Sequence, residues 1–413
     1  MKRLLLAVAV ATLTAVGVSA QQDNEFTVDA ELRTRGEHNN GAVIPRIDQE
    51  QAANFINERA RLSVSYKRSN LQLKASVQHT GVWGQDAMNQ DNGRATMNEA
   101  WARMNFGDHF FAQLGRMALD YDDGRLLGSQ DWSVSGSWHD ALRLGYEDQH
   151  NRLHGIVAMN QTAENNRGDY YAGPMPYKSM QVLWYQYQSL LLPLRLSAIG
   201  INVGRELGTQ GHGMTWYQQT VGANVSFQPM KWGLNLAGYY QMGTNSDGRD
   251  VQAWMASARL LFDLSQSVAL YAGYDYLSGN KDIQKVNAFN GLYGSYHDFY
   301  GAMDYFPGYV YCGLNDIHGG VDVTLGSKVR LKADYHYFMA AEDVRGNDRP
   351  LGQEIDFQFA ARLMKDVTLR GGYSVMFAKP AINYVKGAGS SDEWQDWAWL
   401  QLSISPRIFS TKW

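Results

Sequence analysis

The connections between segments of this chain alternate between short turns and long loops from about Phe26 to the C-terminus. The segments themselves are roughly ten residues long and alternate apolar with polar residues. The short turns lie at 67–70, 107–109, 147–151, 189–193, 228–230, 263–267, 326–327 and 364–366. The long loops lie at 37–53, 80–95, 117–137, 161–179, 203–214, 242–249, 278–315, 340–352 and 379–394. Eight turns and nine loops join eighteen segments. We therefore predict an all-β fold, a transmembrane antiparallel β-barrel of about 18 strands with short periplasmic turns and long extracellular loops.

The first residues have the pattern of a secretory signal peptide. Lys2 and Arg3 form a basic start, residues 4–18 are apolar, and Val18-Ser19-Ala20 provides small residues before a cleavage point. A transmembrane anchor is the alternative, but about fifteen apolar residues are short for a bilayer. We therefore expect residues 1–20 to be a signal peptide and residues 21–413 to form a single outer-membrane barrel.

Residues 329–337 illustrate how the two faces of a strand are assigned. Val329 and Leu331 share one face, whereas Arg330 and Lys332 share the other. One Arg or Lys on the lipid face near the midplane costs about 2–4 kcal/mol, so the charged face should line the lumen. The same reasoning assigns Ala60, Leu62 and Val64 to the lipid and Arg59 and Arg61 to the lumen.

A soluble β-sandwich or propeller would also alternate in this way, with its apolar face in a core. That alternative does not explain the signal peptide, the strand number and the regular loop lengths together. A closed barrel of about 16–18 strands is wide enough for an aqueous channel, which makes transport the expected role. No nucleic-acid partner is expected, because removal of two cations with residues 1–20 leaves 35 cations against 41 acids, a net charge of −6.

Catalytic and metal-binding patterns are not apparent. No Ser lies in a GxSxG turn and no His pair has HExxH spacing, so we expect no enzymatic activity, no cofactor and no metal. Two alternatives to a channel stay open: a structural or adhesive barrel with a filled lumen, and an outer-membrane hydrolase.

Several motifs resemble the alginate-export family of outer-membrane porins. They are Leu114-Gly115-Arg116, Asp123-Gly124-Arg125-Leu126-Leu127-Gly128, Asp131-Trp132, Asp140-Ala141-Leu142-Arg143-Leu144, residues 292–306, Leu351-Gly352-Gln353-Glu354-Ile355-Asp356 and Asp366-Val367-Thr368-Leu369. The resemblance implies a single-chain barrel, expected to be a monomer, through which a polysaccharide or small organic or anionic solutes pass by diffusion. The apolar strand faces predict outer-membrane lipid as a partner, and the last strand, with Phe409 and Trp413 at its end, is similar to the signal read by the barrel-assembly machinery, which we also expect as a partner. By matched motif, Arg116, Arg125 and Arg143 become pore-lining or loop-anchoring cations, with Asp140, Glu354 and Asp356 as their counter-charges.

Face assignment and resemblance together give the candidate site. The expected pore-lining and selectivity residues are Arg33, Arg59, Arg61, Lys74, Arg103, Arg116, Arg143, Arg330, Lys332, Glu354, Asp356, Arg362 and Arg370. The 278–315 loop is too long to be a simple connection, and we expect it to fold against the barrel mouth or into the lumen and to narrow the channel. Its expected constriction residues are Tyr293, Tyr296, His297, Phe299, Tyr300 and Asp304. Mixed inward charges leave the cargo open and predict a mild anion preference.

Overall fold

The computed structural model describes residues 24–88, 93–208, 212–281, 284–344, 346 and 348–413. The predicted signal peptide, residues 1–20, lies outside the described residues. Strands make up almost all of the regular structure in the described part of the chain, and no described helix is long and apolar enough to cross a membrane.

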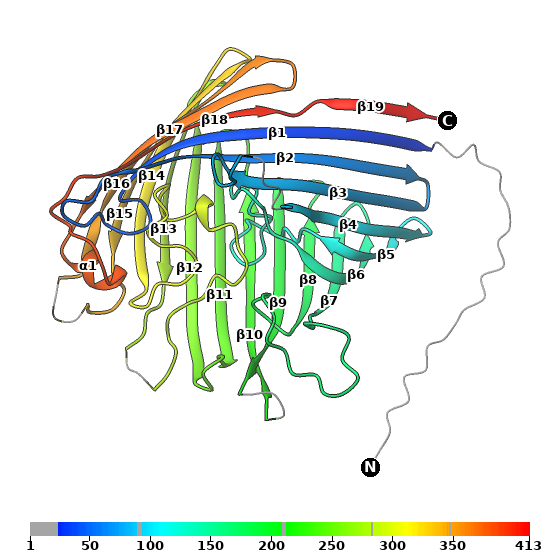
Figure 1. The fold of residues 1–413 in the computed structure, drawn as a ribbon, viewed down its shortest axis with the longest axis horizontal. Helices are drawn as coiled ribbons and strands as arrows, with labels where there is room; N and C mark the ends of the chain where they lie inside the picture. Colours follow the sequence, from blue (N-terminus) through cyan, green and yellow to red (C-terminus); the bar gives the residue numbers. More distant parts are fainter. Residues whose placement is uncertain (1–23, 89–92, 209–211, 282–283, 345, 347) are drawn as a thin grey trace.

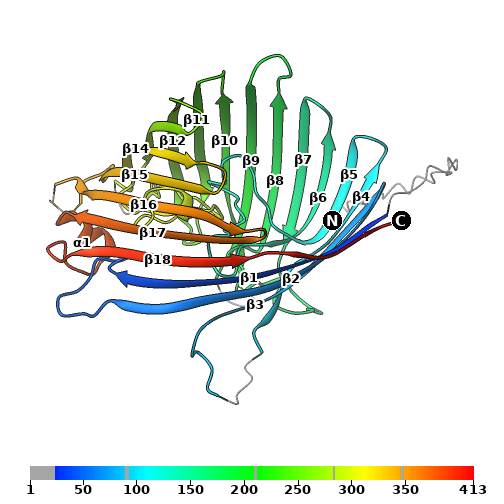
Figure 2. The same cartoon turned by 90° about the horizontal axis from the view of Figure 1, so that it is seen from above.

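The strands follow one another around a single sheet (Figures 1 and 2). They are β1 (Glu25–Asn40), β2 (Ala53–Arg68), β3 (Leu71–Val82), β4 (Ala95–Phe106), β5 (Phe110–Met117), β6 (His139–Glu147), β7 (Asn151–Met159), β8 (Ser179–Gln188), β9 (Leu194–Leu207), β10 (Met214–Phe227), β11 (Trp232–Thr244), β12 (Asp250–Asp263), β13 (Val268–Leu277), β14 (Leu314–Leu325), β15 (Val329–Met339), β16 (Pro350–Met364), β17 (Val367–Ala378), β18 (Gln395–Ile404) and β19 (Arg407–Lys412). A 3₁₀ turn, η1 (Tyr296–Asp298), and a short helix, α1 (Ala381–Lys386), lie in loops.

The sheet closes because β1 pairs antiparallel with β2 on one side and with β18 and β19 on the other. Figure 1 shows β18 and β19 running one after the other along β1. Pro406 separates them, since proline has no N–H for the ladder, and β1 carries a register shift between Val28 and Asp29 opposite this break. The Pro406 carbonyl still accepts the N–H of Ala30 at 3.0 Å. The two pieces thus form one interrupted strand, and the predicted closed 18-strand barrel is confirmed.

The predicted division of the strands into two faces is also found. On β15, Leu331 is 40% exposed on the outer face, whereas Asp334 and His336 are buried inside. On β2, Leu62 lies outside at 48% exposed, and Arg59 lies inside at 1%. An apolar outer face suits lipid, and a polar inner face suits a wet lumen.

Two long connections fold into the barrel instead of projecting from it. They are the β5–β6 loop (118–138) and the β13–β14 loop (278–313), which is the yellow segment carrying η1 inside the ring of strands in Figure 1. Leu127, Tyr305 and Phe306 belong to these loops and are at most 2% exposed. The loops contact each other through a short parallel bridge between Leu127 and Tyr293. A large cluster of buried apolar side chains therefore lies inside the barrel, and many of its members are loop residues.

Candidate functional site

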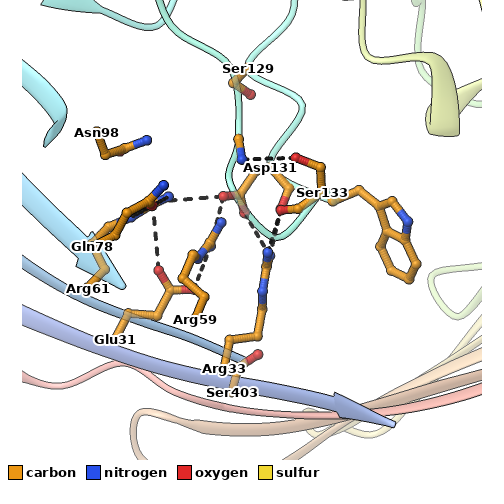
Figure 3. A network of polar contacts seen from close by, with 12 residues as sticks. Glu31, Arg33, Arg59, Arg61, Gln78, Asn98, Ser129, Asp131, Ser133 and Ser403 are labelled. Atoms are coloured by element: carbon orange, nitrogen blue, oxygen red, sulfur yellow. Dashed lines mark hydrogen bonds and ion pairs between the residues drawn. The ribbon is translucent and has the colours of Figure 1, made fainter. Parts of the chain in front are cut away.

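The inner wall of β1 and β2 carries three neighbouring arginines, Arg33, Arg59 and Arg61, which we call the arginine cluster (Figure 3). Arg33 and Arg59 are direct cross-strand partners, and Arg61 is paired with Glu31. The side chains of these arginines are 7%, 1% and 17% exposed, respectively. Three positive guanidinium groups that are this close together and this buried require hydrogen-bond acceptors around them.

The tip of the β5–β6 loop provides most of those acceptors. Arg33 donates to the backbone carbonyls of Asp131 and Ser133, each at 2.6 Å. Arg59 Nη2 donates to Glu31 at 2.6 Å and to the Asp131 carboxylate at 2.9 Å, and its Nε and Nη1 have no hydrogen-bond partner among the described residues. Asp131 itself is 66% exposed, so one carboxylate reaches the cluster from the open side. The loop tip thus occupies a surface suited to carboxylates, because guanidinium groups match them geometrically.

A stack of rings extends this contact to the second loop. The Arg35 guanidinium lies 3.9 Å from the centre of the Trp132 ring, and the Trp132 ring stacks on His297 at 4.0 Å with an interplanar angle of 8°. Arg35 also donates to the Trp132 carbonyl at 3.0 Å. Arg35 was not among the predicted site residues, although it shares the inward face of β1 with Arg33. The stack joins β1, the β5–β6 loop and the β13–β14 loop.

Arg125 anchors the two loops to the wall formed by β12 and β13. It donates to both oxygens of Asp275 at 2.9 and 3.0 Å, to the Tyr300 hydroxyl at 2.8 Å, and to Asp123 at 2.8 Å. Burial opposes its charge, but Asp275, Tyr300 and Asp123 outweigh this and raise the pKa of Arg125 well above its ordinary value. The guanidinium lies 4.1 Å from the centre of the Phe299 ring. Arg125, placed in the site by resemblance alone, is therefore a loop anchor.

Further contacts fix the β13–β14 loop at its other end. The N–H of Met303 donates to Glu354 at 2.8 Å, and the carbonyl of Met303 accepts the N–H of Val43 at 2.8 Å. The Tyr305 hydroxyl donates to the Gly41 carbonyl, and Lys386 of α1 donates to the Tyr305 carbonyl at 2.6 Å. Glu354 was expected to balance an arginine. That expectation is wrong, because Glu354 forms no ion pair within the described residues and instead binds the loop backbone beside Asp356.

The six predicted constriction residues lie together in this loop, inside the barrel. Tyr293 and Tyr300 are 7% and 6% exposed, and His297 is bonded to Asp304 at 3.0 Å. Tyr296 donates to the Leu292 carbonyl within the loop, and Phe299 packs near Arg125. The position inside the barrel agrees with the predicted fold of the loop, and the rings pack mainly against the loops themselves.

Most of the other predicted cations on the inner face are paired with carboxylates or amides. Arg103 donates to Glu147 at 3.1 Å, Arg330 to Asp322 at 2.7 Å and Lys332 to Asp334 at 2.7 Å. Lys74 pairs with Glu99, and Arg143 binds Gln113. Arg362 and Arg370 are exposed on the inner face of β16 and β17 and form no ion pair within the described residues. Arg370, together with Arg330, Lys332 and Asp356, lines a cavity of about 500 Å³ beside the β13–β14 loop.

One predicted pore-lining residue, Arg116, lies on the other side of the wall. It shares its face of β5 with Leu114, which is 54% exposed on the outside, and it binds Asp140 at 2.8 and 2.9 Å. Asp140 likewise shares the outer face of β6 with Leu142. Asp140 was expected as a counter-charge and does pair with Arg116, but the pore-lining placement of Arg116 is wrong, because a motif match does not tell on which face a strand residue points. Phe110, Leu114 and Arg116 are separated by even numbers of residues along β5, so the alternation of the strand alone places Arg116 on the same outer face as Leu114.

Comparison with solved structures supports the fold over nearly the whole chain. Pseudomonas aeruginosa OccK10 (OpdN) matches with 14% identity and a TM-score of 0.63, covering 93% of this chain and 99% of that one. Acinetobacter baumannii OccAB4 matches with 10% identity and a TM-score of 0.63, covering 94% and 98%. Pseudomonas aeruginosa OpdK, solved with vanillate, matches with 11% identity and a TM-score of 0.63, covering 94% and 99%. No curated protein matches the chain.

The family comparison agrees with the resemblance seen in the motifs. The family model described as alginate export matches residues 13–387, which is most of the chain. Together with the closed 18-strand barrel, this match places the protein in the outer membrane as a channel, and the chain belongs to the alginate export family.

Proposed function

We propose that this channel lets carboxylated solutes, either a polysaccharide or small organic anions, cross the outer membrane by diffusion. The observation that carries the proposal is the arginine cluster, which donates to Glu31 on the wall and, from the loop, to the Asp131 carboxylate and two backbone carbonyls. A passing carboxylate can compete with these acceptors, because its two oxygens match the geometry of the guanidinium donors.

A second group of cations continues the path toward the other end of the barrel. Arg330 is 66% exposed although it is bonded to Asp322, and Arg370 and Arg362 are exposed without an ion pair in the described part of the chain. Exposed charges in a wet lumen are not strongly desolvated, so they attract anions without trapping them. A solute passes through a channel only if it binds well enough to enter and weakly enough to leave. Exposed arginines such as Arg330, Arg362 and Arg370 meet both conditions, because they attract anions but stay hydrated.

The relatives are consistent with an acidic cargo of either size. The family description names alginate, a polyuronate, and the OpdK structure holds vanillate, an aromatic carboxylate. Both ligands present carboxylates, so we assign the substrate class by that group. We further propose that residues 1–20 are a cleaved signal peptide, that the barrel-assembly machinery inserts the protein, and that it works as a monomer.

Ion selectivity in planar bilayers tests the proposal. We expect wild type to conduct with a mild anion preference, measured as reversal potential in a salt gradient, and vanillate or uronate oligomers to reduce the current. Replacing Arg362 and Arg370 with Gln should shift the reversal potential toward cations, because two unpaired inward charges are lost. Arg116→Gln is the control, since the same change on the outer face should leave selectivity unchanged. Strong cation selectivity of the wild type would contradict the proposal.

A structural or adhesive barrel is the second candidate, because both infolded loops build a buried apolar cluster inside the lumen. That candidate predicts almost no conductance at any salt concentration. The same bilayer recording therefore separates it from a channel.

A further inference from the structure

Three ligand-type side chains converge on the inner wall of β13 and β14. Asp275 and Asp316 are direct cross-strand partners, and His318 follows Asp316 by two residues on the same face. One ligand atom from each lies within 4.8 Å of the other two. The side chains of Asp275, Asp316 and His318 are 3%, 0% and 8% exposed. We propose that Asp275, Asp316 and His318 bind one divalent transition-metal ion, with Zn²⁺ as the best match.

The His318 ring gives the observation that points to a ligand. Its Nε2 atom is buried and has no hydrogen-bond partner among the described residues. It lies 3.6 Å from Asp275 Oδ2, which is too long for a hydrogen bond. Two ligands that each lie about 2.0–2.1 Å from a tetrahedral zinc are about 3.3 Å apart, close to the observed separation. The imidazole is thus placed as a ligand to a shared ion rather than as a donor to Asp275.

The surroundings of the three ligands have the features of a supported metal site. Asp316 accepts a hydrogen bond from His336 Nδ1 at 2.9 Å, and Asp275 is held by Arg125 at 2.9 and 3.0 Å. The rings of His318 and His336 stack at 5.4 Å with an interplanar angle of 16°. Hydrogen bonds of this kind orient metal ligands and keep a site pre-formed.

The donor set indicates the class of metal. Two carboxylates and one imidazole suit Zn²⁺ and its neighbours in the first transition series better than Ca²⁺ or Mg²⁺, which prefer oxygen ligands alone. All three residues line the 500 Å³ cavity, so water from the lumen can fill a fourth position. The sequence contains no metal-binding motif for this site, because Asp275 lies on β13 whereas Asp316 and His318 lie on β14.

The competing arrangement is an internal ion pair, in which a protonated His318 lies between the two carboxylates and no metal binds. The test uses the intact barrel in detergent, treated with a chelator and then titrated with Co²⁺ while visible absorption is recorded. We expect one Co²⁺ per barrel, displaced by Zn²⁺. His318→Ala should weaken binding by at least about tenfold. His154→Ala is the matched control, since His154 is a buried histidine on the inner wall of β7, and it should leave binding unchanged.

Two results would overturn the proposal: no stoichiometric binding by wild type, or binding that His318→Ala leaves intact. Heat-dependent migration on gels checks that each variant is folded. If His318→Ala does not fold, X-ray absorption of the Zn²⁺-loaded wild type decides the question. One imidazole with oxygen ligands is expected, and a shell with two or more imidazoles contradicts the assignment.

Discussion

Replacing Arg125 with Met tests whether the two infolded loops are held by a buried charge pair. The substitution keeps most of the side-chain volume but leaves Asp275, 3% exposed, without its guanidinium partner. Breaking a buried pair in this way costs about 3–5 kcal/mol, and the contact with Phe299 adds about 1 kcal/mol. Asp275 belongs to a barrel strand and its side chain is 3% exposed while the loops are docked, so it becomes fully hydrated only when the loops move away. The cost therefore falls on loop docking rather than on the barrel.

A cost of about 3–5 kcal/mol raises the population of undocked loops by roughly two to four powers of ten. We expect larger and more fluctuating single-channel currents in Arg125→Met, with the heat-modifiable gel migration of the barrel unchanged. In chelator-treated barrels, adding Asp275→Asn removes the unpaired charge and should restore much of the wild-type conductance, as a double-mutant cycle measures. Currents identical to wild type in Arg125→Met would refute the reasoning, as would equal effects of the single and double variants.

Two further predictions concern the barrel wall and the extracellular loops. Leu331→Asp should reduce the yield of folded barrel on gels much more than Arg330→Asp, because Leu331 faces lipid whereas the Arg330 side chain is 66% exposed in the lumen; equal yields would contradict the face assignment. Burial lowers the pKa of Lys386 in α1 to about 8, below its ordinary 10.5. The undocked state then binds more protons between pH 8 and 10.5, so docking of the Lys386 amine on the Tyr305 carbonyl should strengthen as pH rises through this window. Current fluctuations should decline from pH 7 to 9.5 in wild type and stay constant in Lys386→Met, and a pH response in that variant would exclude Lys386 as its source.

The barrel could be predicted from the sequence because its signals are local. A period of two fixes the face of residues such as Leu331 and Arg330, and turn lengths fix the strand order. The inside of the barrel could not be predicted to the same degree. Whether Asp131 reaches Arg59 or Asp275 reaches His318 depends on contacts between distant strands and loops. The error for Arg116 has a different cause. Its pore-lining position was predicted from the family motif, although the alternation along β5 correctly indicates the outer face.

The contacts of the β13–β14 loop also set an order of assembly. Its partners lie far apart in the chain: Gly41 and Val43 beyond β1, Leu126 in the β5–β6 loop, and Glu354 on β16. Gly41 and Glu354 come near each other only when β1 meets β18 and the ring closes. The full set of loop contacts can therefore form only after closure, and we expect the lumen of a newly inserted barrel to be open to protease until the loop has docked. On this reasoning, we expect maturation of the pore to be a separate kinetic step from insertion of its wall.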